Sequence, residues 1–400
     1  MNRRYTNTTV RDMMARMSDS ASSFDEVAVS VPTMLFDLKS IYPLSALRDI
    51  TMTTAGGTVT QADAEFSVST DGDGSSEAVL QSSERARYVA GYDGVAGVAI
   101  RVASMPVGNQ EIEWGNTDFQ NGLAIGIDAG GMFIRLYSGG DVVVEQRRSE
   151  WLYPRPEDLD PQETNVYRIQ YRWYGTGPYR VAISGIDDFG RGVSLPIASV
   201  QGDRQGPVTL DPNQPIAVRA RNQGTTGNPL DVRVMGRQYF VMGDYEPDKR
   251  IIGEYRFAQE VGTDFVPLIA FRGRGGVFRS VSRKLSGSSI SASGGDVFWQ
   301  IRLFSGITGG EWAAPRNTDG GAESATEFNV GATAVDGEGV QIFGGDFAVS
   351  GQGNSSRIAS AELPTLDVPS AADADVVALV ARSISGTATV SSALRVQEEW

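Results

Sequence analysis

The chain contains no cysteine and no histidine in its 400 residues. Without these side chains it cannot form a Ser-His-Asp or Cys-His nucleophile, a thiolate or imidazole metal site, or a haem with a histidine ligand. The chemistry that remains is that of carboxylates, which cleave glycosides in pairs and bind magnesium or calcium. Disulfides are excluded as well. We therefore expect stability to come from ordinary hydrophobic cores and from contacts between subunits.

Long apolar runs are also missing. No stretch of about 20 apolar residues occurs, the length that a helix needs to cross a bilayer. We therefore expect no insertion into a membrane. Residues 1–20 are basic but have no apolar core, so they do not resemble a secretory signal.

Positive charge is scarce, because 49 acidic residues outnumber 35 basic ones and the formal net charge is −14. Nucleic-acid binding needs a basic face, so this balance disfavours it. The run Arg272–Gly276 is similar to an RGG element, but one copy in an acidic chain indicates a turn with solvated arginines. Only Lys39, Lys249 and Lys284 are lysines. Acid excess with few lysines is typical of proteins from salt-loving hosts, and a GC-rich genome, which favours arginine codons, gives the same skew.

Alternation of apolar and polar residues is the main feature that is present. In residues 165–183, Tyr167, Ile169 and Tyr171 alternate with polar residues, a Gly/Pro turn follows, and the alternation resumes at Tyr179. This pattern is typical of an antiparallel hairpin with one buried face. Similar short segments recur at spacings of roughly 8–12 residues, separated by Gly, Asp and Asn turns. The sequence therefore predicts an all-β protein.

Two β-domains are predicted, because a polar segment with a proline, residues 243–249, divides the chain. Residues 47–245 are predicted to form a jelly-roll-like (lectin-like) β-sandwich, and residues 250–400 a second, smaller β-sandwich domain. Residues 1–46 are predicted to form an N-terminal arm, in which residues 6–17 have the spacing of a short amphipathic helix. That helix is either a frayed terminus or a docking segment for a neighbouring subunit.

The aromatic-rich strand and Gly-x-Gly turn at 166–177 come in an ordered series with the segments 96–105, 121–136, 149–161 and 215–222. This series resembles surface proteins of tailed bacterial and archaeal virus particles. A weaker likeness, in segments between 267 and 387, is to the β-domain that often follows in that group. The resemblance implies a structural or attachment role in a virion, as a capsid turret or spike or as a tail or baseplate fibre, and no chemistry.

On this resemblance we expect a non-enzymatic structural protein of a virus particle, located in the virion, which projects from capsid or tail and mediates host attachment. The expected partners are other copies of the chain as a homo-oligomer, other virion proteins, and a host surface glycan or glycoprotein. The charge balance adds the hypothesis of a halophilic archaeal virus. Two alternatives stay open: a carbohydrate-binding or glycan-degrading appendage, and a cellular surface or adhesion protein of an extremophile.

One acidic segment is similar to part of a calcium loop. Asp71, Asp73 and Glu77 place hard oxygen ligands at alternating positions, which suits Ca²⁺. The segment is too short for the full twelve-residue spacing, and a solvated hairpin turn has the same composition. Beyond this Ca²⁺ hypothesis we expect no cofactor.

Aromatic and acidic residues in two loops suggest a sugar site, because rings stack on sugar faces and carboxylates accept hydrogen bonds from sugar hydroxyls. The candidates are Trp151, Tyr153, Glu157, Asp158, Asp160 and Trp312. An ordinary exposed loop explains the acidic cluster equally. Glycosidases need two acids at a set separation, which spacing in sequence does not supply, so no catalytic residue is predicted. Trp173 and Trp299 lie on alternating strands and are predicted to be core residues.

Overall fold

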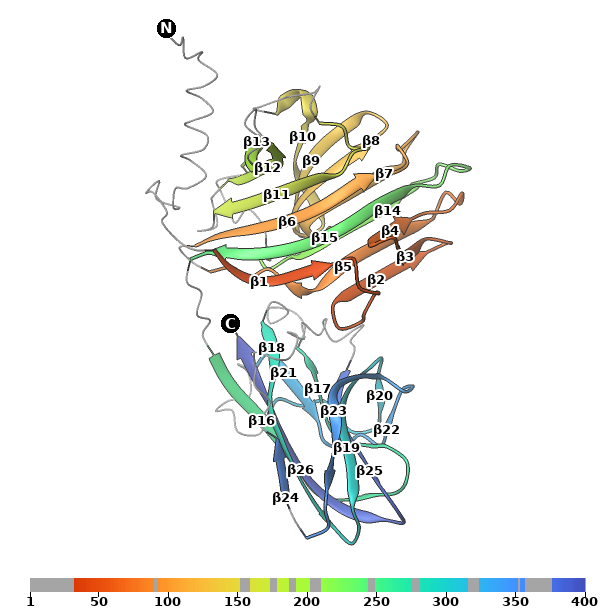
Figure 1. Ribbon diagram of the computed structural model, residues 1–400, viewed down its shortest axis with the longest axis vertical. Helices are drawn as coiled ribbons and strands as arrows, with labels where there is room; N and C mark the ends of the chain where they lie inside the picture. The colour runs from red at the N-terminus through yellow and green to blue at the C-terminus, as the bar shows by residue number, and fades with distance from the viewer. Residues whose placement is uncertain are drawn as a thin grey trace. The chain divides into compact units, whose positions relative to one another are not determined.

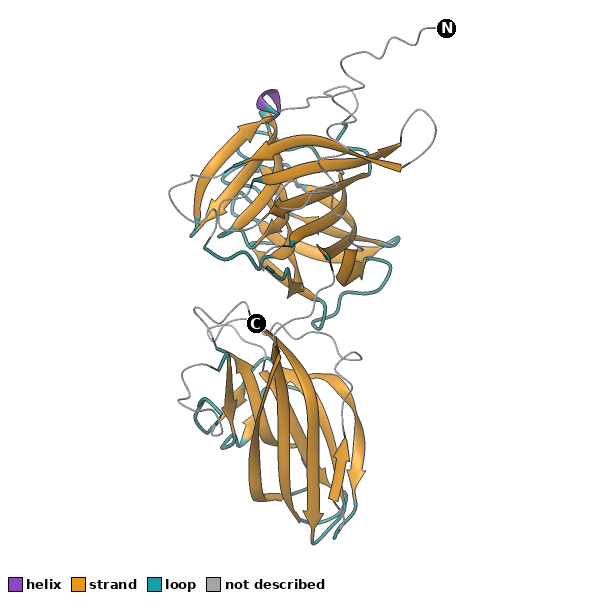
Figure 2. Ribbon diagram, turned by 90° about the vertical axis from the view of Figure 1, so that its left-hand side faces the viewer, coloured by secondary structure: helices purple, strands orange, loops and turns teal. Residues whose placement is uncertain are grey.

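The computed structural model describes residues 32–89, 92–151, 159–172, 178–186, 192–201, 210–243, 249–274, 281–315, 324–351, 353–356 and 376–399. The regular secondary structure of these residues is almost entirely antiparallel β-strand, which confirms the predicted all-β class (Figure 2). One short 3-10 helix, η1 (Arg148–Glu150), is the helical element within these ranges. No helix in this part of the chain is long and apolar enough to cross a membrane.

Two compact units divide the chain between Tyr245 and Glu246. In the first unit an eight-stranded and a seven-stranded sheet pack face to face (Figure 1). The eight-stranded sheet has the order β13 (Gly192–Val200), β12 (Tyr179–Ile186), β11 (Asn165–Arg172), β6 (Asp93–Val102), β15 (Asp231–Met242), β4 (Glu65–Ser69) and β3 (Thr58–Ala62), with β1 (Pro32–Lys39) on β15. The seven-stranded sheet has the order β10 (Asp141–Arg147), β9 (Gly131–Ser138), β8 (Gly122–Asp128), β7 (Glu111–Thr117), β14 (Pro215–Arg221), β5 (Glu77–Arg85) and β2 (Asp49–Thr54).

The second unit is built from a four-stranded and a five-stranded sheet. The four-stranded sheet has the order β16 (Lys249–Val261), β26 (Ala388–Glu399), β18 (Ser282–Ser293) and β24 (Gly353–Ser356). The five-stranded sheet has the order β21 (Thr326–Asn329), β17 (Val266–Gly273), β25 (Val376–Ser383), β19 (Val297–Phe304) and β23 (Val340–Ala348). A small ribbon of β20 (Ile307–Thr308) and β22 (Ala334–Val335) accompanies them.

The hairpin predicted at 165–183 is present as β11 and β12. Its register pairs Tyr167 with Ile183 and Tyr171 with Tyr179, and all four side chains are buried. Tyr167 contacts Trp114 of the opposite sheet, with ring centroids 5.1 Å apart. Apolar residues at period two therefore bury one face of the hairpin against the facing sheet, as the alternation predicted.

The first sandwich begins earlier than its predicted start at residue 47. β1, which lies within the predicted arm, pairs along β15 and buries Phe36 and Leu38 in the core. Pro32 is the first residue of this strand, a position where a proline does not interrupt the ladder. The predicted helix at 6–17 lies outside the described residues.

Candidate functional site

The outward surface of the seven-stranded sheet, here called the outer face, carries an unusual set of side chains. On β7, Ile112 and Trp114 point into the core, so Glu111 and Glu113 point to the outer face. Both glutamates are nevertheless buried, with 4% and 1% of their surface exposed. A buried carboxylate needs charge partners, because desolvation otherwise disfavours its ionised form.

Arginines on β14, which is next to β7, and on β9, which is two strands away, supply those partners. Arg219 donates from Nε to Glu113 at 3.1 Å and contacts it through Nη2 as well. Arg221 donates to Glu111 at 2.6 and 3.0 Å, and Arg135 donates to Glu111 at 2.5 Å. Arg219 and Arg221 of β14 directly face Glu113 and Glu111 of β7, whereas Arg135 of β9 reaches Glu111 across β8.

The pKa values follow from this arrangement. Burial raises the pKa of Glu113, but the Arg219 guanidinium and the hydrogen bond from Tyr137 outweigh it, so the pKa is lowered from 4.5. The phenol of Tyr137 donates to Glu113 at 2.6 Å, and burial together with that carboxylate raises the pKa of Tyr137. Glu113 is therefore ionised near neutral pH and has no proton to give to a leaving group.

In the middle of the outer face, two aromatic rings pack over small residues. A Cβ on Gly126 would lie 2.3 Å from the Phe133 ring, so the glycine makes room for that ring. Phe119, from the β7–β8 turn, packs with Ala124 and Ala217 under the Arg219 guanidinium, which is 4.0 Å from its ring centroid. The Phe133 and Phe119 rings therefore cover the centre of the outer face.

A polar pocket of about 490 Å³ lies at one end of the outer face. Its lining combines strand residues of the outer face with residues of three turns. They are Gly108, Asn109, Glu111, Asp128, Ala129, Gly130, Arg147 and Gln223. Carboxylates, a guanidinium and side-chain amides thus converge on one volume, which offers both hydrogen-bond donors and acceptors.

The charged lining of the pocket is held in place. Arg147 donates to both carboxylate oxygens of Asp128 at 2.9 and 2.8 Å, and the Asp128 carboxylate also accepts from the Gly130 amide at 2.7 Å. A second contact joins Arg147 to Glu145 at 2.8 Å, and its guanidinium lies over the Phe133 ring at 5.2 Å. These contacts fix the Arg147 and Asp128 side chains before any ligand arrives.

The two turns that carry Asn109 and Gln223 are joined by one buried amide, that of Asn222. Its Oδ1 accepts from Gln110 at 3.0 Å, and its Nδ2 donates to the carbonyls of Asp71 and Asp73 at 2.8 and 2.6 Å. The Asn109 and Gln223 side chains are both exposed at the rim. Hydrogen bonds therefore hold the backbone of the two turns, while the Asn109 and Gln223 side chains are exposed to a ligand.

The predicted calcium ligands do not converge. The Asp71 carboxylate accepts from the Asp73 amide at 2.8 Å, and Asp73 in turn accepts from the amide and hydroxyl of Ser75, both at 2.7 Å. These are the contacts of a turn. Glu77 lies on the outer face, 3.9 Å from Arg219. Within the described ranges no three acidic side chains come close enough to share a metal ion.

The predicted sugar contact Trp151 is placed differently by the structure. Only 4% of its surface is exposed, it belongs to the first core, and its Nε1 donates to the Gln146 carbonyl at 3.4 Å. Trp151 is therefore not available to stack on a sugar, because the fold of the chain after β10 turns its ring inward. Asp160 is exposed and caps a turn by accepting from the Gln162 amide. Tyr153, Glu157 and Asp158 lie outside the described residues.

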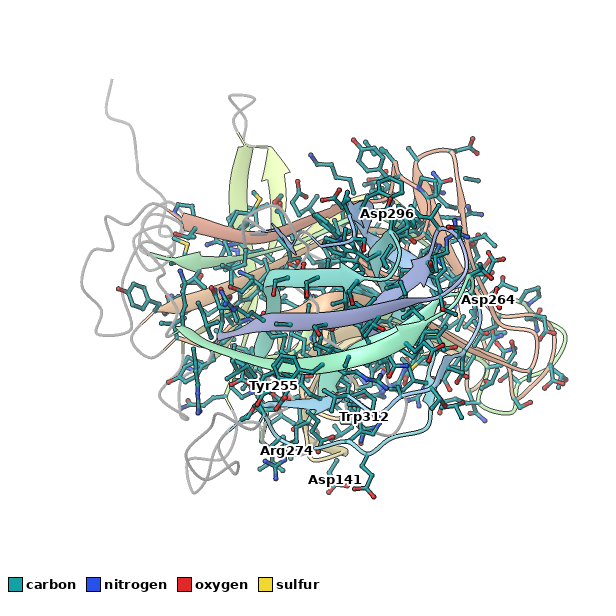
Figure 3. The ribbon with its side chains drawn as sticks, turned by 90° about the horizontal axis from the view of Figure 1, so that it is seen from below. Asp141, Tyr255, Asp264, Arg274, Asp296 and Trp312 are labelled. Carbon is teal, nitrogen blue, oxygen red and sulfur yellow. The ribbon has the colours of Figure 1, made fainter. Side chains whose placement is uncertain are left out.

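Trp312 lies in the second unit, as labelled in Figure 3. It is partly buried against an apolar cluster, and the Arg272 guanidinium covers its ring at 4.3 Å. Arg272 also pairs with Glu327 at 3.0 Å, so the RGG-like run begins as strand β17 rather than as a turn with solvated arginines. Trp299 is fully buried, as predicted, whereas Trp173 lies outside the described residues. A sugar contact at Trp312 stays a prediction.

The residues of the polar pocket were not predicted as a site. One signal was present, because Glu111 and Glu113 alternate with Ile112 and Trp114 and so had to share a face opposite the apolar one. Nothing in their spacing relates them to Asp128 or Arg147, which are brought beside them by the order β10-β9-β8-β7.

No protein-family model and no curated protein matches the chain. Among solved structures, the Emp47p carbohydrate recognition domain is 13% identical, with 53% of this chain and 97% of that chain covered and a TM-score of 0.35. A glycosyl hydrolase family 16 protein from Mycobacterium smegmatis is 13% identical over 52% of this chain and 100% of that one, with a TM-score of 0.35. A pseudo beta-1,3-glucanase of Mycobacterium tuberculosis is 12% identical over 53% and 99%, with a TM-score of 0.36.

Proposed function

We propose that this chain is a non-enzymatic carbohydrate-binding protein whose sugar site is the polar pocket at the end of the outer face. The observation that carries this proposal is the pocket lining. It joins the Asp128 carboxylate, the Arg147 guanidinium and the amides of Asn109 and Gln223 around about 490 Å³. That volume falls within the roughly 300–1,000 Å³ of small-molecule sites.

Sugar hydroxyls donate and accept hydrogen bonds at the same carbon, so a sugar site needs both kinds of partner close together. Asp128 supplies acceptors, and the two amides supply both. The partly exposed charges of Asp128 and Arg147 already compensate each other. A neutral polyhydroxyl ligand therefore fits better than an ion, because it adds hydrogen bonds without adding an uncompensated charge.

Binding without turnover is proposed because both buried glutamates of the outer face are paired with arginines. A retaining or inverting glycosidase keeps one carboxyl protonated to act as general acid. Glu113 instead has a lowered pKa, and Glu111 is held between Arg135 and Arg221. Both carboxylates serve as partners of arginines and are hydrogen-bonded by them rather than by solvent.

The proposal is tested with a glycan array followed by titration calorimetry on the full chain. The double variant Asn109→Ala/Gln223→Gly removes both rim amides, and glycine suits the φ of +47° at position 223. We expect it to weaken binding at least tenfold, because each amide contributes two hydrogen-bonding groups. The control is Asp141→Asn, an exposed acid at the opposite end of β10, which should bind as the wild type does.

Two results would count against the site. Wild-type protein that binds no glycan on a broad array contradicts the function, and unchanged affinity in the double variant contradicts the location. Membership of a virus particle stays a separate prediction of the sequence resemblance. It is tested by identifying the chain in purified particles, and its outcome does not bear on the pocket.

A further inference from the structure

One face of the five-stranded sheet in the second unit carries aromatic rings and arginines together. On β19, Trp299 is fully buried on one side of the sheet, so Phe298 and Arg302 point to the other side, where both are partly exposed. The register places Phe298 directly between Arg382 of β25 and Phe347 of β23. Two rings and a guanidinium therefore form one row across three neighbouring strands (Figure 1).

A third ring completes this surface, that of Phe265, which precedes β17. Its centroid lies 6.1 Å from that of Phe298, and the Phe298 and Phe347 centroids are 5.1 Å apart. Gly345 gives the middle ring room, because a Cβ at that position would overlap with it. Phe347 is 55% exposed, so the cluster has an open side. The aromatic face, as it is called here, consists of Phe265, Phe298, Arg302, Phe347 and Arg382.

Both arginines lie against these rings without an ion pair. The Arg382 guanidinium is 5.1 Å from the Phe265 centroid and 5.7 Å from that of Phe298, and the Arg302 guanidinium is 5.7 Å from the Phe265 centroid. In the described part of the chain, no acidic side chain lies within 4.0 Å of either one. The Nε of Arg302 is buried and has no hydrogen-bond partner among these residues. Because a charge that is removed from water needs a partner, this face favours a negatively charged group.

Arg272 of the same unit provides a comparison. Its guanidinium also lies over a ring, that of Trp312, but it pairs with Glu327 as well. The chain has 49 acidic residues for 35 basic ones, so acidic partners are plentiful. Two neighbouring arginines that lack one therefore indicate a place where the negative charge comes from a ligand.

Recognition at this face depends on side chains. β19 pairs with β25 on one side and with β23 on the other, so its backbone groups are already used. An extended peptide would find no strand edge here for its own amides, whereas a sugar chain has no need of one. Gln341, which faces Arg302 and is exposed, adds an amide that can bind hydroxyl groups.

We propose that the aromatic face binds an acidic oligosaccharide, one whose sugars carry carboxylate groups. Each ring offers an apolar surface on which one side of a sugar can stack, and each guanidinium offers paired N–H donors that match a carboxylate. Phe298 and Arg302 are four residues apart on one strand, which is about 13 Å, so the face is longer than a single sugar. The site belongs to the second unit and does not rest on the pocket of the first.

The number of charges favours a sugar over a nucleic acid. Two guanidinium groups along this length suit a chain with an acid on every second sugar. A single-stranded nucleic acid carries a phosphate on every nucleotide and needs a basic groove that follows its backbone. The aromatic face has two cationic side chains, and the chain as a whole has a formal charge of −14.

The first experiment is titration calorimetry on the full chain with short oligosaccharides of galacturonate, mannuronate and guluronate. Each is compared with its methyl ester, which keeps the sugar and removes the charge. We expect at least one acid to bind, and at least tenfold more tightly than its ester. An oligothymidylate of similar length is the comparison for nucleic acid, and we expect it to bind more weakly than that acid.

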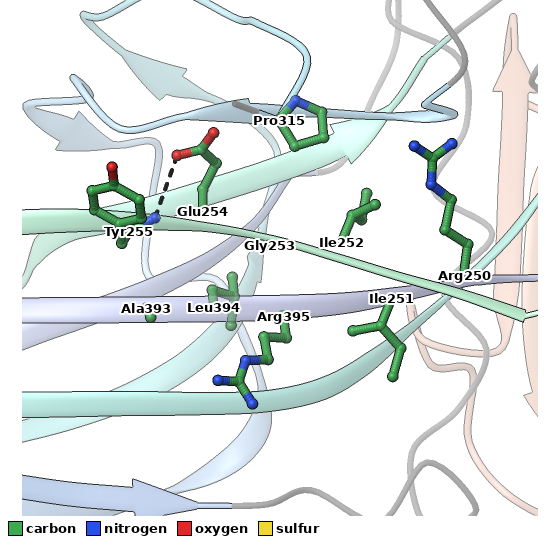
Figure 4. Close-up of a pocket in the computed structure, with 10 residues that line it drawn as sticks. All are labelled: Arg250, Ile251, Ile252, Gly253, Glu254, Tyr255, Pro315, Ala393, Leu394 and Arg395. Atoms are coloured by element: carbon green, nitrogen blue, oxygen red, sulfur yellow. Dashed lines mark hydrogen bonds between the residues drawn. The ribbon is translucent and has the colours of Figure 1, made fainter. Parts of the chain in front are cut away.

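The second experiment separates the charges from the rings. Arg382→Gln removes the charge of an exposed side chain and should weaken binding of the acid at least tenfold, while the ester changes little. Phe347→Ala removes a stacking surface and should weaken binding of acid and ester alike. The matched controls are Arg395→Gln and Phe257→Ala, which change exposed residues of the four-stranded sheet and should bind as the wild type does. Figure 4 shows Arg395 there, on β26.

Arg302→Gln adds a readout of stability. Since Arg302 has no acidic partner in the described part of the chain, its replacement should leave the urea midpoint of the second unit unchanged or higher, yet should weaken binding of the acid at least tenfold. A lower midpoint with unchanged affinity would show that Arg302 supports the fold and does not meet a ligand, which contradicts the proposal.

Three further results overturn the proposal. They are the absence of binding by every acidic oligosaccharide, equal affinities for acid and ester, and unchanged affinity in both arginine variants. Tighter binding of the oligothymidylate would replace the sugar by a nucleic acid. The variant Asn109→Ala/Gln223→Gly changes no residue of the aromatic face, so the pocket of the first unit and this site fail separately.

Discussion

The two units enclose charged side chains in different ways. The first unit buries an ion pair, in which Arg237, fully buried, contacts Asp49, whose side chain is 3% exposed. Burial lowers the pKa of Arg237, and two of its nitrogens have no hydrogen-bond partner. The second unit also has a buried ion pair, between Glu399 and Lys284 at 2.9 Å, but two of its other buried charges contact neutral groups. Arg283 donates to the Ala325 carbonyl at 2.7 and 3.0 Å.

The buried Glu398 of the second unit follows the same pattern. One carboxylate oxygen accepts from the Ser324 hydroxyl at 2.9 Å and from the Thr326 hydroxyl at 2.8 Å. When several hydroxyls hydrogen-bond to a buried charge, each contact contributes a small part of its stabilisation. When the charge has one ion-pair partner, most of the stabilisation comes from that single contact. The first unit should therefore be sensitive to single charge deletions, and the second should lose stability in small steps.

The largest effect is expected for Asp49→Ala. It leaves Arg237 buried without its charge partner, which costs about 3–5 kcal/mol of the free energy of unfolding. Urea unfolding of the full chain should show a lower midpoint for the first unit alone. The double variant Asp49→Leu/Arg237→Met should recover most of the loss, because a buried pair replaced as a whole is often neutral. Asp37→Ala breaks a solvent-exposed pair with Lys39 and should cost less than about 1 kcal/mol. Similar losses of unfolding free energy for Asp49→Ala and Asp37→Ala would show that the buried ion pair is no more important for stability than the exposed one.

An intermediate and pH-dependent effect is expected for Glu113→Gln. The native pKa of Glu113 is lowered, so its contribution to stability is complete above the unfolded pKa near 4.5 and is lost as the pH falls through the native pKa below it. At pH 7 the variant should lose about 1–3 kcal/mol, because Arg219 keeps a weaker partner. Free energies of unfolding measured between pH 2.5 and 7 should converge for the two proteins in acid. A difference that does not depend on pH would show that the loss is not electrostatic.

The smallest effect is expected in the second unit, for Thr326→Val. The change removes one hydroxyl donor to Glu398 but leaves that of Ser324, so we expect a loss of about 1 kcal/mol. Ser293→Ala, at an exposed position of β18, is the control and should change little. If Thr326→Val lost as much stability as Asp49→Ala, the second unit would be as sensitive as the first to the loss of one contact to a buried charge.

Period-two patterns predicted the strands and their buried faces where the pattern was regular. The β11–β12 hairpin and the buried Trp299 follow directly from it, because a strand side chain points either inward or outward. Trp151 lies outside any such pattern, after β10, and its position depends on how the chain folds back over the core. The segment 71–77 has the composition of a metal loop, yet the Asp71 and Asp73 carboxylates accept hydrogen bonds from amides of their own turn.

By itself, the sequence determined the all-β class and excluded thiolate and imidazole chemistry, because both depend only on local alternation and on which residue types are present. The tertiary structure alone decided that Asn109, Asp128, Arg147 and Gln223 share one pocket. It also decided that β25, β19 and β23 bring an arginine and two aromatic rings into one row. The reason is physical: the period of a strand fixes the direction of each side chain relative to its own backbone, whereas the neighbour of a strand is fixed by contacts between residues far apart in the chain.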